Sequence, residues 1–430
     1  MHWHRSSTGD LVIALVVALF LGIGVRPAGA AEAALTLERA WQLAEQANPG
    51  LGAARANLAA AEGQVTDSRS ALWNNPQLLL GGARRSLPRP GQSSFGARDV
   101  EVGLAQSFET AGQQGFRREA AGQDLEAVRL GIEETRRQLR GAVEQRFVRV
   151  LALQLRIAAE DEGLRLFDDA AAAVRRQADA GEASRLDRNF AQVEAERARN
   201  QRAALNEQLT DARAELAAAL QMPPDVLPQA VGDLDVLEAD LSLEGLLARV
   251  AERPLLRSME RREKAARSRL DLERASVYPD VTVGLSSGRQ GGVDGAESFM
   301  QLSISLPLPL FRRNATGIGR AVTELTQARI ESTAVSRDSR ALIIALWQKR
   351  ESLMARVERL EQAMQARLDE NRRLSEISRN AGEIGLLQVL LVNRQVLDGR
   401  RDLLDARTDL RLATVALKAA AGWPEVMDRR

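Results

Sequence analysis

The chain has 430 residues, of which 27% are charged and 3% aromatic, and its 59 basic residues nearly balance its 58 acidic ones. This near-neutrality excludes the strong basic field that draws proteins to nucleic acid. There is no cysteine, and both histidines, His2 and His4, lie in the leader described below. Thiol and imidazole chemistry and Cys/His zinc sites are therefore excluded from the mature chain. An abundance of Ala, Leu, Arg and Glu predicts long helices and coiled coil.

Residues 1–30 are predicted to be a secretory signal peptide. Arg5 supplies a positive start, 11–25 is an apolar run, and Ala28-Gly29-Ala30 is a small-residue cleavage site. The apolar run is shorter than the roughly 20 residues that a spanning helix needs. No later stretch is apolar for long enough to span a bilayer as a helix. If the mature protein enters a membrane, we therefore expect it to do so by strands.

The mature chain contains an internal repeat, because two similar openings are each followed by Pro at the start of a helix. The openings are Leu35-Thr36-Leu37-Glu38 with Asn48-Pro49, and Leu241-Ser242-Leu243-Glu244 with Arg253-Pro254. Each repeat is predicted to run helix, helix, strand, strand and long helical hairpin. The predicted segments are a first repeat at 31–222, a linker at 223–240 that crosses the outside of the rod, a second repeat at 241–424 and a tail at 425–430.

Four segments are predicted to be strands, at about 77–87, 98–109, 279–288 and 298–309. Apolar residues such as Val100, Val102 and Leu104 alternate with small or polar ones, which gives a strand one apolar face. Segments of roughly 9–11 residues match a tilted strand crossing a bilayer. The intervening stretches 84–96 and 288–297, rich in Gly, Ser and Arg, are expected to be loops. Aromatic residues flank the strands, as in an interfacial girdle: Trp73, Phe108, Tyr278 and Phe311.

Two interpretations of these strands compete. One is a small soluble sheet that caps the helices with its apolar face inward. The other is a membrane sheet, which is favoured because the helices carry their own apolar seams and the signal peptide directs the chain across the inner membrane. Four strands cannot close a barrel, and small barrels need about eight, so several chains would have to contribute. Three copies would give twelve strands, although the alternation alone does not select three over two or four.

The longest predicted elements are two helical hairpins, at 113–220 and 313–421. In the outgoing helix of each, apolar residues recur at steps of three, four and seven, which predicts a coiled-coil seam. These residues are Leu125, Val128, Ile132, Leu139, Val143, Phe147, Val150, Ile157, Leu164, Phe167 and Val174 in the first, and Leu346, Leu353, Val357, Leu360, Met364, Leu368 and Ile377 in the second. At about 1.5 Å per residue each outgoing helix would be roughly 100 Å long, so we expect an elongated molecule.

The hairpins turn at Ala180-Gly181-Glu182 and Ala381-Gly382-Glu383. Each glycine suits a left-handed position after a helix, because it has no Cβ to clash. Ser184 and Asp187 are predicted to form a capping box that starts the returning helix, and Gly385 with Gln388 a weaker version of it. Each tip is either a plain turn between packed helices or part of a functional end. The repetition of the pattern favours the second interpretation.

With these features the chain resembles the TolC family of outer-membrane efflux channels, over essentially all of residues 35–424. Within that family it is most similar to the outer-membrane component of cobalt-zinc-cadmium type heavy-metal efflux systems. The resemblance rests on the repeat and on three motifs: 108–114 leading into the first hairpin, 306–314 leading into the second, and the tip at 180–187.

The resemblance implies a mainly helical chain with a small β part, in a homotrimer that joins a twelve-stranded barrel in outer-membrane lipid to a helical tunnel in the periplasm of a Gram-negative bacterium. It implies that the tips dock a periplasmic adaptor, itself joined to a proton-driven inner-membrane pump. The implied docking residues are Gly181, Glu182, Ser184, Asp187, Gly382 and Glu383, and the barrel-to-helix junctions are Gly112, Pro307, Pro309 and Phe311.

The resemblance also implies a gate, which some relatives close with aspartates early in the second returning helix. This chain has Gln388 and Leu391 in that region, and the nearest charged candidates are Asp187 and Arg394. The possible gate residues are therefore Asp187, Gln388 and Arg394.

No catalytic residue, cofactor or metal site is expected, because no paired carboxylates, phosphate loop or nucleophile elbow stands out. The predicted function is passive conduction of substrate, divalent heavy-metal cations in this branch, for an adaptor and pump of the resistance-nodulation-division (RND) type. Two alternatives stay open: a channel for drug efflux or type I protein secretion, and a periplasmic coiled-coil scaffold. No nucleic acid partner is expected.

Overall fold

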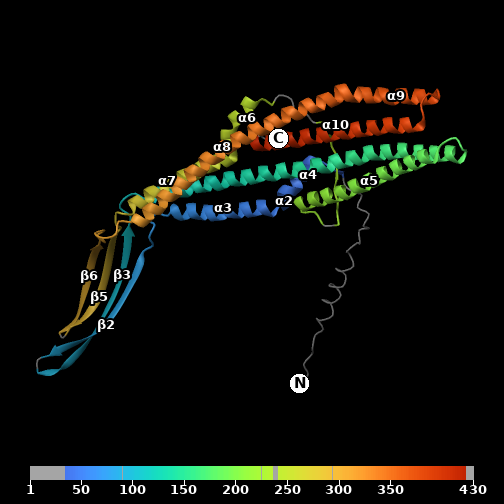
Figure 1. The fold of residues 1–430 in the computed structure, drawn as a ribbon. Helices are drawn as coiled ribbons and strands as arrows, with labels where there is room; N and C mark the ends of the chain where they lie inside the picture. Colours follow the sequence, from blue (N-terminus) through green and yellow to red (C-terminus); the bar gives the residue numbers. More distant parts are fainter. Residues whose placement is uncertain (1–33, 90, 224, 236–240, 293, 423–430) are drawn as a thin grey trace, which may run out of the picture.

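A computed structural model describes residues 34–422 except 90, 224, 236–240 and 293. The predicted signal peptide at 1–30 and the tail at 425–430 lie outside the described residues. Figure 1 shows an elongated molecule in which the long helices run side by side, with a sheet at one end and two hairpin tips at the other.

The first repeat supplies a short strand, two helices, two long strands and the first hairpin. These are β1 (Ala34–Leu35), α2 (Leu37–Ala47), α3 (Pro49–Ser68), β2 (Gln77–Arg89), β3 (Gln92–Phe108), α4 (Gln113–Asp179) and α5 (Arg185–Ala219). The second repeat follows the same order. After β4 (Gln229–Ala230) in the linker, its elements are α6 (Leu243–Arg249), a 3-10 turn (Val250–Glu252), α7 (Pro254–Ala275), β5 (Val281–Gly292), β6 (Gly295–Ser305), α8 (Ala315–Arg359), a π segment (Leu360–Gln365), α9 (Ala366–Asn380) and α10 (Leu386–Ala421).

The openings of the two repeats use the same capping chemistry. The side chain of Thr36 accepts a hydrogen bond from the backbone N–H of Arg39, and that of Ser242 accepts one from Gly245. Such caps satisfy N–H groups that have no partner inside the helix. The next helix of each repeat begins with Pro49 or Pro254, whose fixed φ and missing N–H suit the first turn.

The sheet is antiparallel and ordered β2-β3-β5-β6, so the two repeats meet at the β3–β5 pair. The predicted loops at 84–96 and 288–297 are wrong, because β2 pairs with β3 out to Arg89 and Gln92, and β5 with β6 out to Gly292 and Gly295. The prediction of a strand to residue 309 is also wrong, because β6 ends at Ser305. Pro307 and Pro309 follow, and proline cannot donate to a strand ladder.

The long helix α4 has 67 residues, which corresponds to about 100 Å and agrees with the length predicted from the sequence. Within its apolar stripe, Val143, Phe147 and Val150 are buried in a core shared with α2 and α5, and Phe167 and Val174 are buried nearer the tip. The linker packs on the same core, where β4 pairs in parallel with β1 and the Gln154 side chain bonds both backbone groups of Ala230. No helix in the described ranges is long and apolar enough to span a bilayer.

The second outgoing arm differs from the single continuous helix that its stripe predicts. Six residues, Leu360–Gln365, form a π segment between α8 and α9. A π segment inserts extra chain into a helix, and each extra residue rotates the side chains that follow by about 100°. Met364 and Leu368 then pack on Gly399 of α10, where a Cβ would lie 2.3 Å from the Leu368 Cδ1 atom. The stripe ends at Ile377, which is exposed.

A row of ion pairs joins α4 of the first repeat to α10 of the second. Glu160 is 1% exposed and pairs with Arg401, and the Nη2 atom of Arg411 lies 2.9 Å from the Oε1 atom of Glu144. Closer to the tip, Arg400 pairs with Glu162 at 2.9 Å. Residues later in α4 pair with residues earlier in α10, as expected for antiparallel helices. The pairs therefore fix the register between the two helices.

The row ends at Glu134, where three elements meet. This carboxylate is 4% exposed and accepts hydrogen bonds from Arg137 at 2.6 Å and from Arg253 at 2.8 Å. The same guanidinium groups donate to the backbone carbonyls of Ala419 and Ala420 in the last turn of α10. Burial by itself raises the pKa of the Glu134 carboxyl, but the bonds from Arg137 and then Arg253 outweigh it, so the pKa lies below its ordinary value.

We expect Glu134→Gln to destabilise the protein by about 3 kcal/mol near neutral pH, because two buried guanidinium groups lose their carboxylate. A depressed carboxyl pKa contributes stability above its ordinary value of 4.5, and that stability is lost as the pH falls through the folded pKa. Thermal unfolding measured at decreasing pH should therefore show a smaller fall in melting temperature below pH 4.5 in the variant than in the parent.

The matched control is Glu133→Gln, because Glu133 is an exposed carboxylate next along α4. The control should unfold like the parent. Equal behaviour of both variants would contradict a stabilising role for the Glu134 cluster.

Candidate functional site

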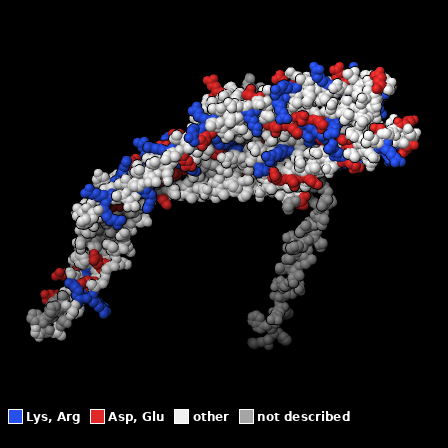
Figure 2. Space-filling view, in the orientation of Figure 1, with Lys and Arg blue, Asp and Glu red and all other residues white. Residues whose placement is uncertain are grey.

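The outward face of the sheet is apolar and exposed. Alternate residues on all four strands point away from the inner face, and most are at least half exposed: Leu78, Leu80, Val100, Val102, Leu104, Leu285, Met300, Leu302 and Ile304. In Figure 2 the sheet next to the helices is almost free of charged side chains, which gather nearer the hairpin ends. An exposed apolar surface of this size marks a face that contacts lipid or another protein.

The inward face of the same strands is lined mostly by small and polar side chains, with Leu79 and Phe299 as apolar exceptions. Ser107 and Thr282 lie opposite each other, with their hydroxyl oxygens 2.7 Å apart. Gly103 lies opposite Ser286, and a Cβ on Gly103 would come within 2.7 Å of the Ser286 Cβ atom. A side chain at this position of β3 would therefore collide with β5. This face can border water without burying polar groups.

Two strands of the sheet, β2 and β6, have a partner on one side only. Their outer edges carry rows of backbone N–H and C=O groups with no ladder partner in the described chain. Such an edge is a template for pairing with another strand. The sheet is thus incomplete in two respects: an apolar face has no cover, and two edges have no neighbour.

At each junction between sheet and long helix, a residue in the left-handed region begins the helix. Gly112, with φ of 76°, precedes α4, and Asn314, with φ of 52°, precedes α8. The Asn314 side chain also donates to the Glu273 carboxylate at 2.6 Å. Sequence reasoning singled out Gly112 but not Asn314, although Asn is the non-glycine residue that best tolerates this conformation.

Gln113 is a junction residue that sequence reasoning missed. It is 2% exposed; its oxygen accepts from the N–H of Ala111 at 2.8 Å, and its Nε2 donates to the carbonyls of Ala275 and Tyr278. It therefore links the start of α4 to the end of α7. The predicted junction residues Pro307, Pro309 and Phe311 lie between β6 and α8, and Phe311 is 95% exposed.

The first hairpin tip has a well-defined capping structure. Gly181 has φ of 80°, and the N–H of Glu182 donates to the carbonyl of Gln177 at 2.8 Å, which is a Schellman motif. Ser184 and Asp187 form a capping box: the Asp187 N–H donates to the Ser184 hydroxyl and the Ser184 N–H donates to the Asp187 carboxylate, both at 3.1 Å. All four predicted docking residues here belong to one rigid turn.

The second tip repeats the first half of this arrangement. Gly382 has φ of 75°, and the N–H of Glu383 donates to the carbonyl of Ser378 at 2.9 Å. The weak capping box expected from Gly385 and Gln388 is not formed, because Gly385 has no side-chain acceptor and no cap bond is made. Gln388 is exposed, and its backbone N–H donates to the Gly385 carbonyl.

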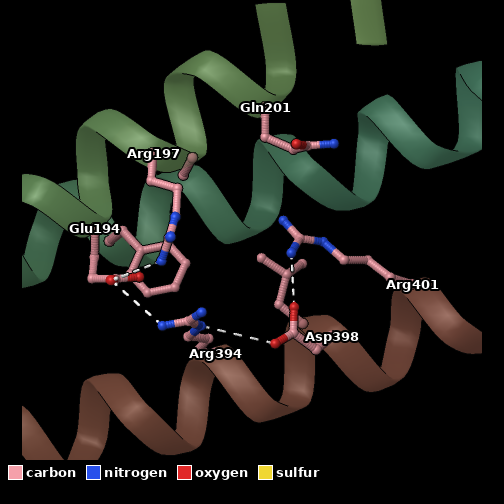
Figure 3. Close-up of a pocket in the computed structure, with 9 residues that line it drawn as sticks. Glu194, Arg197, Gln201, Arg394, Asp398 and Arg401 are labelled. Carbon is pink, nitrogen blue, oxygen red and sulfur yellow. Dashed lines mark hydrogen bonds and ion pairs between the residues drawn. The ribbon is translucent and has the colours of Figure 1, made fainter. Parts of the chain in front are cut away.

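A charged groove of about 210 Å³ lies between the two hairpins and is lined by residues of α4, α5 and α10 (Figure 3). Glu194 of α5 is 7% exposed and lies 3.5 Å from Arg197 of the same helix and 3.5 Å from Arg394 of α10. Arg394 also pairs with Asp398. Of the possible gate residues, Arg394 lies in this cluster, whereas Asp187 lies in the capping box and pairs with Ser184.

Sequence reasoning found Arg394 but not its partner Glu194. The missing information is the register between α5 and α10, which no spacing within either helix reveals. Among the described residues, no group of three or more His, Cys, Asp or Glu side chains is arranged to hold a metal ion.

A helical rod that carries an incomplete sheet with an apolar outward face defines a class of membrane channel proteins. The family model described as "Outer membrane efflux protein" matches residues 40–221 and 248–423. The chain belongs to this family, whose place is the outer membrane. The predicted resemblance to TolC-type channels is thereby confirmed.

The chain is also similar to individual proteins of known name. The chain is 27% identical over 370 residues, covering 85% of each protein, to the cobalt-zinc-cadmium resistance protein CzcC of Cupriavidus metallidurans. It is 26% identical over 411 residues to the pyoverdine export outer membrane protein OpmQ of Pseudomonas putida, covering 90% of this chain and 85% of that one. A solved structure of CusC matches with a TM-score of 0.72 at 20% identity, covering 90% and 92% of the two chains. The predicted fold class, mainly helical with a small TolC-like β part, is confirmed.

The outward face can be tested with two neighbouring residues of β6. If the apolar outward face contacts lipid, we expect Leu302→Arg to destabilise the protein in the membrane by about 2–4 kcal/mol, because it places a charge within that apolar face. The readout is the amount of folded, heat-modifiable protein recovered from outer membranes.

Gln301→Arg is the matched control, because Gln301 lies on the opposite, inward face and is exposed. The control should accumulate like the parent. A larger loss for Gln301→Arg than for Leu302→Arg would reverse the assignment of the two faces.

Proposed function

We propose that three copies of this chain pool their strands into a twelve-stranded barrel in the outer membrane, above a tunnel built from their helices. The observation that carries this proposal is the four-stranded sheet, whose outward face is apolar and whose two edges have no partner strand among the residues that the structure describes. In a bilayer every backbone polar group needs a partner, so β2 of one copy must pair with β6 of the next. Closure of a ring in this way leaves no edge.

The channel conducts passively and performs no covalent chemistry. The inward face offers hydroxyl groups, small side chains and backbone, which can line a wet path. The free energy for export comes from an inner-membrane pump of the RND type, and a periplasmic adaptor connects the two. The tips at Gly181 and Gly382 support adaptor docking, because both glycines make the same left-handed turn at the end farthest from the sheet. The possible gate residues Asp187, Gln388 and Arg394 lie at or near this end.

For the substrate we propose divalent heavy-metal cations, in line with the similarity to a cobalt-zinc-cadmium resistance protein. Carboxylates, carbonyls and water are the groups that cations would meet along the path, so passage involves weak coordination or none. A second candidate, small organic molecules, is favoured by the similarity to a pyoverdine export protein. A strain that lacks this chain should become sensitive to cobalt, zinc or cadmium. Sensitivity to organic compounds alone would overturn the metal substrate and leave the channel intact.

We expect the double variant Gly181→Val/Gly382→Val to lose metal resistance while trimers still reach the outer membrane. Nothing lies within 4 Å of a Cβ at either position, so the harm comes from the left-handed φ, which costs a β-branched residue roughly 1–2 kcal/mol or more. Growth on metal and heat-modifiable migration report the two properties separately.

The conservative variant Gly181→Asn/Gly382→Asn is the control, because Asn tolerates left-handed backbone. It should keep resistance. Full resistance in the valine variant would contradict docking through these turns.

We also expect no tight stoichiometric zinc site in the purified protein. Isothermal titration with Zn²⁺ should give only weak heats, because the chain after the leader has neither cysteine nor histidine. A saturable site at one zinc per chain would contradict passive conduction without coordination.

A further inference from the structure

Three arginines form an outward-facing row just beyond the apolar band of the sheet. Arg84 of β2 lies directly opposite Arg98 of β3, and Arg289 of β5 lies opposite Val100. Each arginine lies on the same face of its strand as the exposed apolar residues. Arg84 and Arg98 are two residues nearer the hairpin ends than Gly82 and Val100, and Arg289 is four residues nearer than Leu285. All three side chains are exposed. The row thus crosses three adjacent strands, with Arg289 one outward position closer to the apolar band than Arg84 and Arg98.

These three guanidinium groups have no carboxylate partner in the described part of the chain. The acidic residues at the same level, Asp99, Glu101 and Glu297, alternate with the outward set and face inward. Asp99 is already bound to Arg85, another inward residue, at 2.6 Å. The outward face at this level therefore carries positive charge that the protein itself does not neutralise.

The position of the row decides what can neutralise it. The strand ends next to the helices are flanked by the exposed aromatic residues Trp73 and Tyr278, which suit a membrane interface. The arginines lie at the opposite boundary of the apolar band. An unpaired arginine is costly in hydrocarbon but inexpensive at an interface, so the row marks the level where acyl chains end and headgroups begin. If the helices are periplasmic, this boundary belongs to the outer leaflet.

We propose that Arg84, Arg98 and Arg289 bind the phosphate groups of a phosphorylated glycolipid in the outer leaflet. This inference rests on the proposed membrane orientation of the channel. Guanidinium groups bind phosphate oxygens through paired, charge-assisted hydrogen bonds. Val100, which is the next outward residue after Arg98, and Leu285, four residues below Arg289, lie where the acyl chains of the same lipid molecule would pack. The continuity of charge and apolar surface selects a lipid over a free anion, because only a lipid satisfies both.

The test compares the parent with Arg84→Ser/Arg98→Ser/Arg289→Ser, each purified from outer membranes in a neutral detergent. Native mass spectrometry measures binding of a bisphosphorylated glycolipid (lipid A), of the same lipid after phosphate removal, and of inorganic phosphate. We expect the triple variant to bind the phosphorylated lipid at least about tenfold more weakly, since each arginine near a charged headgroup layer contributes appreciably. The parent should bind the dephosphorylated lipid as weakly as the variant binds the phosphorylated one.

The control variant Arg340→Ser/Arg359→Ser/Arg367→Ser removes three exposed arginines from α8 and α9 and should bind lipid like the parent. Equal binding by the parent and the sheet variant, or equal binding of the two lipids, would overturn the proposal. Competition by inorganic phosphate at low concentration would assign the row to a free anion instead. Parent protein that fails to enter the outer membrane would overturn the channel itself, which is a separate outcome.

Discussion

The constraint on which the structure depends is the need of every backbone N–H and C=O group for a partner inside a bilayer. The sheet of this chain meets the need between β2 and β3, β3 and β5, and β5 and β6, but not at its two edges. Leu80 and Met300 on its outward face are more than 70% exposed, so nothing in the described part of the chain covers this face. In the proposed assembly, strands of a neighbouring copy would pair with the two edges, and lipid would cover the apolar face.

The helical part is held by interactions of another kind. Apolar clusters along α4 are interrupted by buried carboxylates, each matched by an arginine across the interface with α10 or α7. A buried charge that lost its partner would cost several kcal/mol, so the pairs discriminate against a slipped register more than they add stability. Glu134 and Glu160 therefore fix how the first repeat lies against the second. That register also places the two hairpin tips at the same end of the rod (Figure 1).

Local chemistry was predictable from the sequence, whereas long-range register was not. The stripe through Val143 and Phe147, the left-handed turns at Gly181 and Gly382 and the Ser184 capping box each follow from residues within a few positions of one another. The extension of β2 to Arg89 depends on pairing with β3, which overrides the low strand preference of its Gly and Arg residues. The π segment at Leu360–Gln365 interrupts a stripe whose spacing through Leu353, Val357, Leu360 and Met364 stays regular, so the local pattern does not reveal it. The Glu194–Arg394 pair likewise requires two helices that meet only in the fold.

The most direct test of the central claim is the number of chains in the particle purified from outer membranes. Light scattering in detergent, together with a low-resolution particle image, measures the mass and the symmetry axis. We expect three chains around one axis, with a hollow helical stalk below a short barrel. A water-soluble monomer in which Leu80, Met300 and their neighbours are shielded from solvent would contradict it.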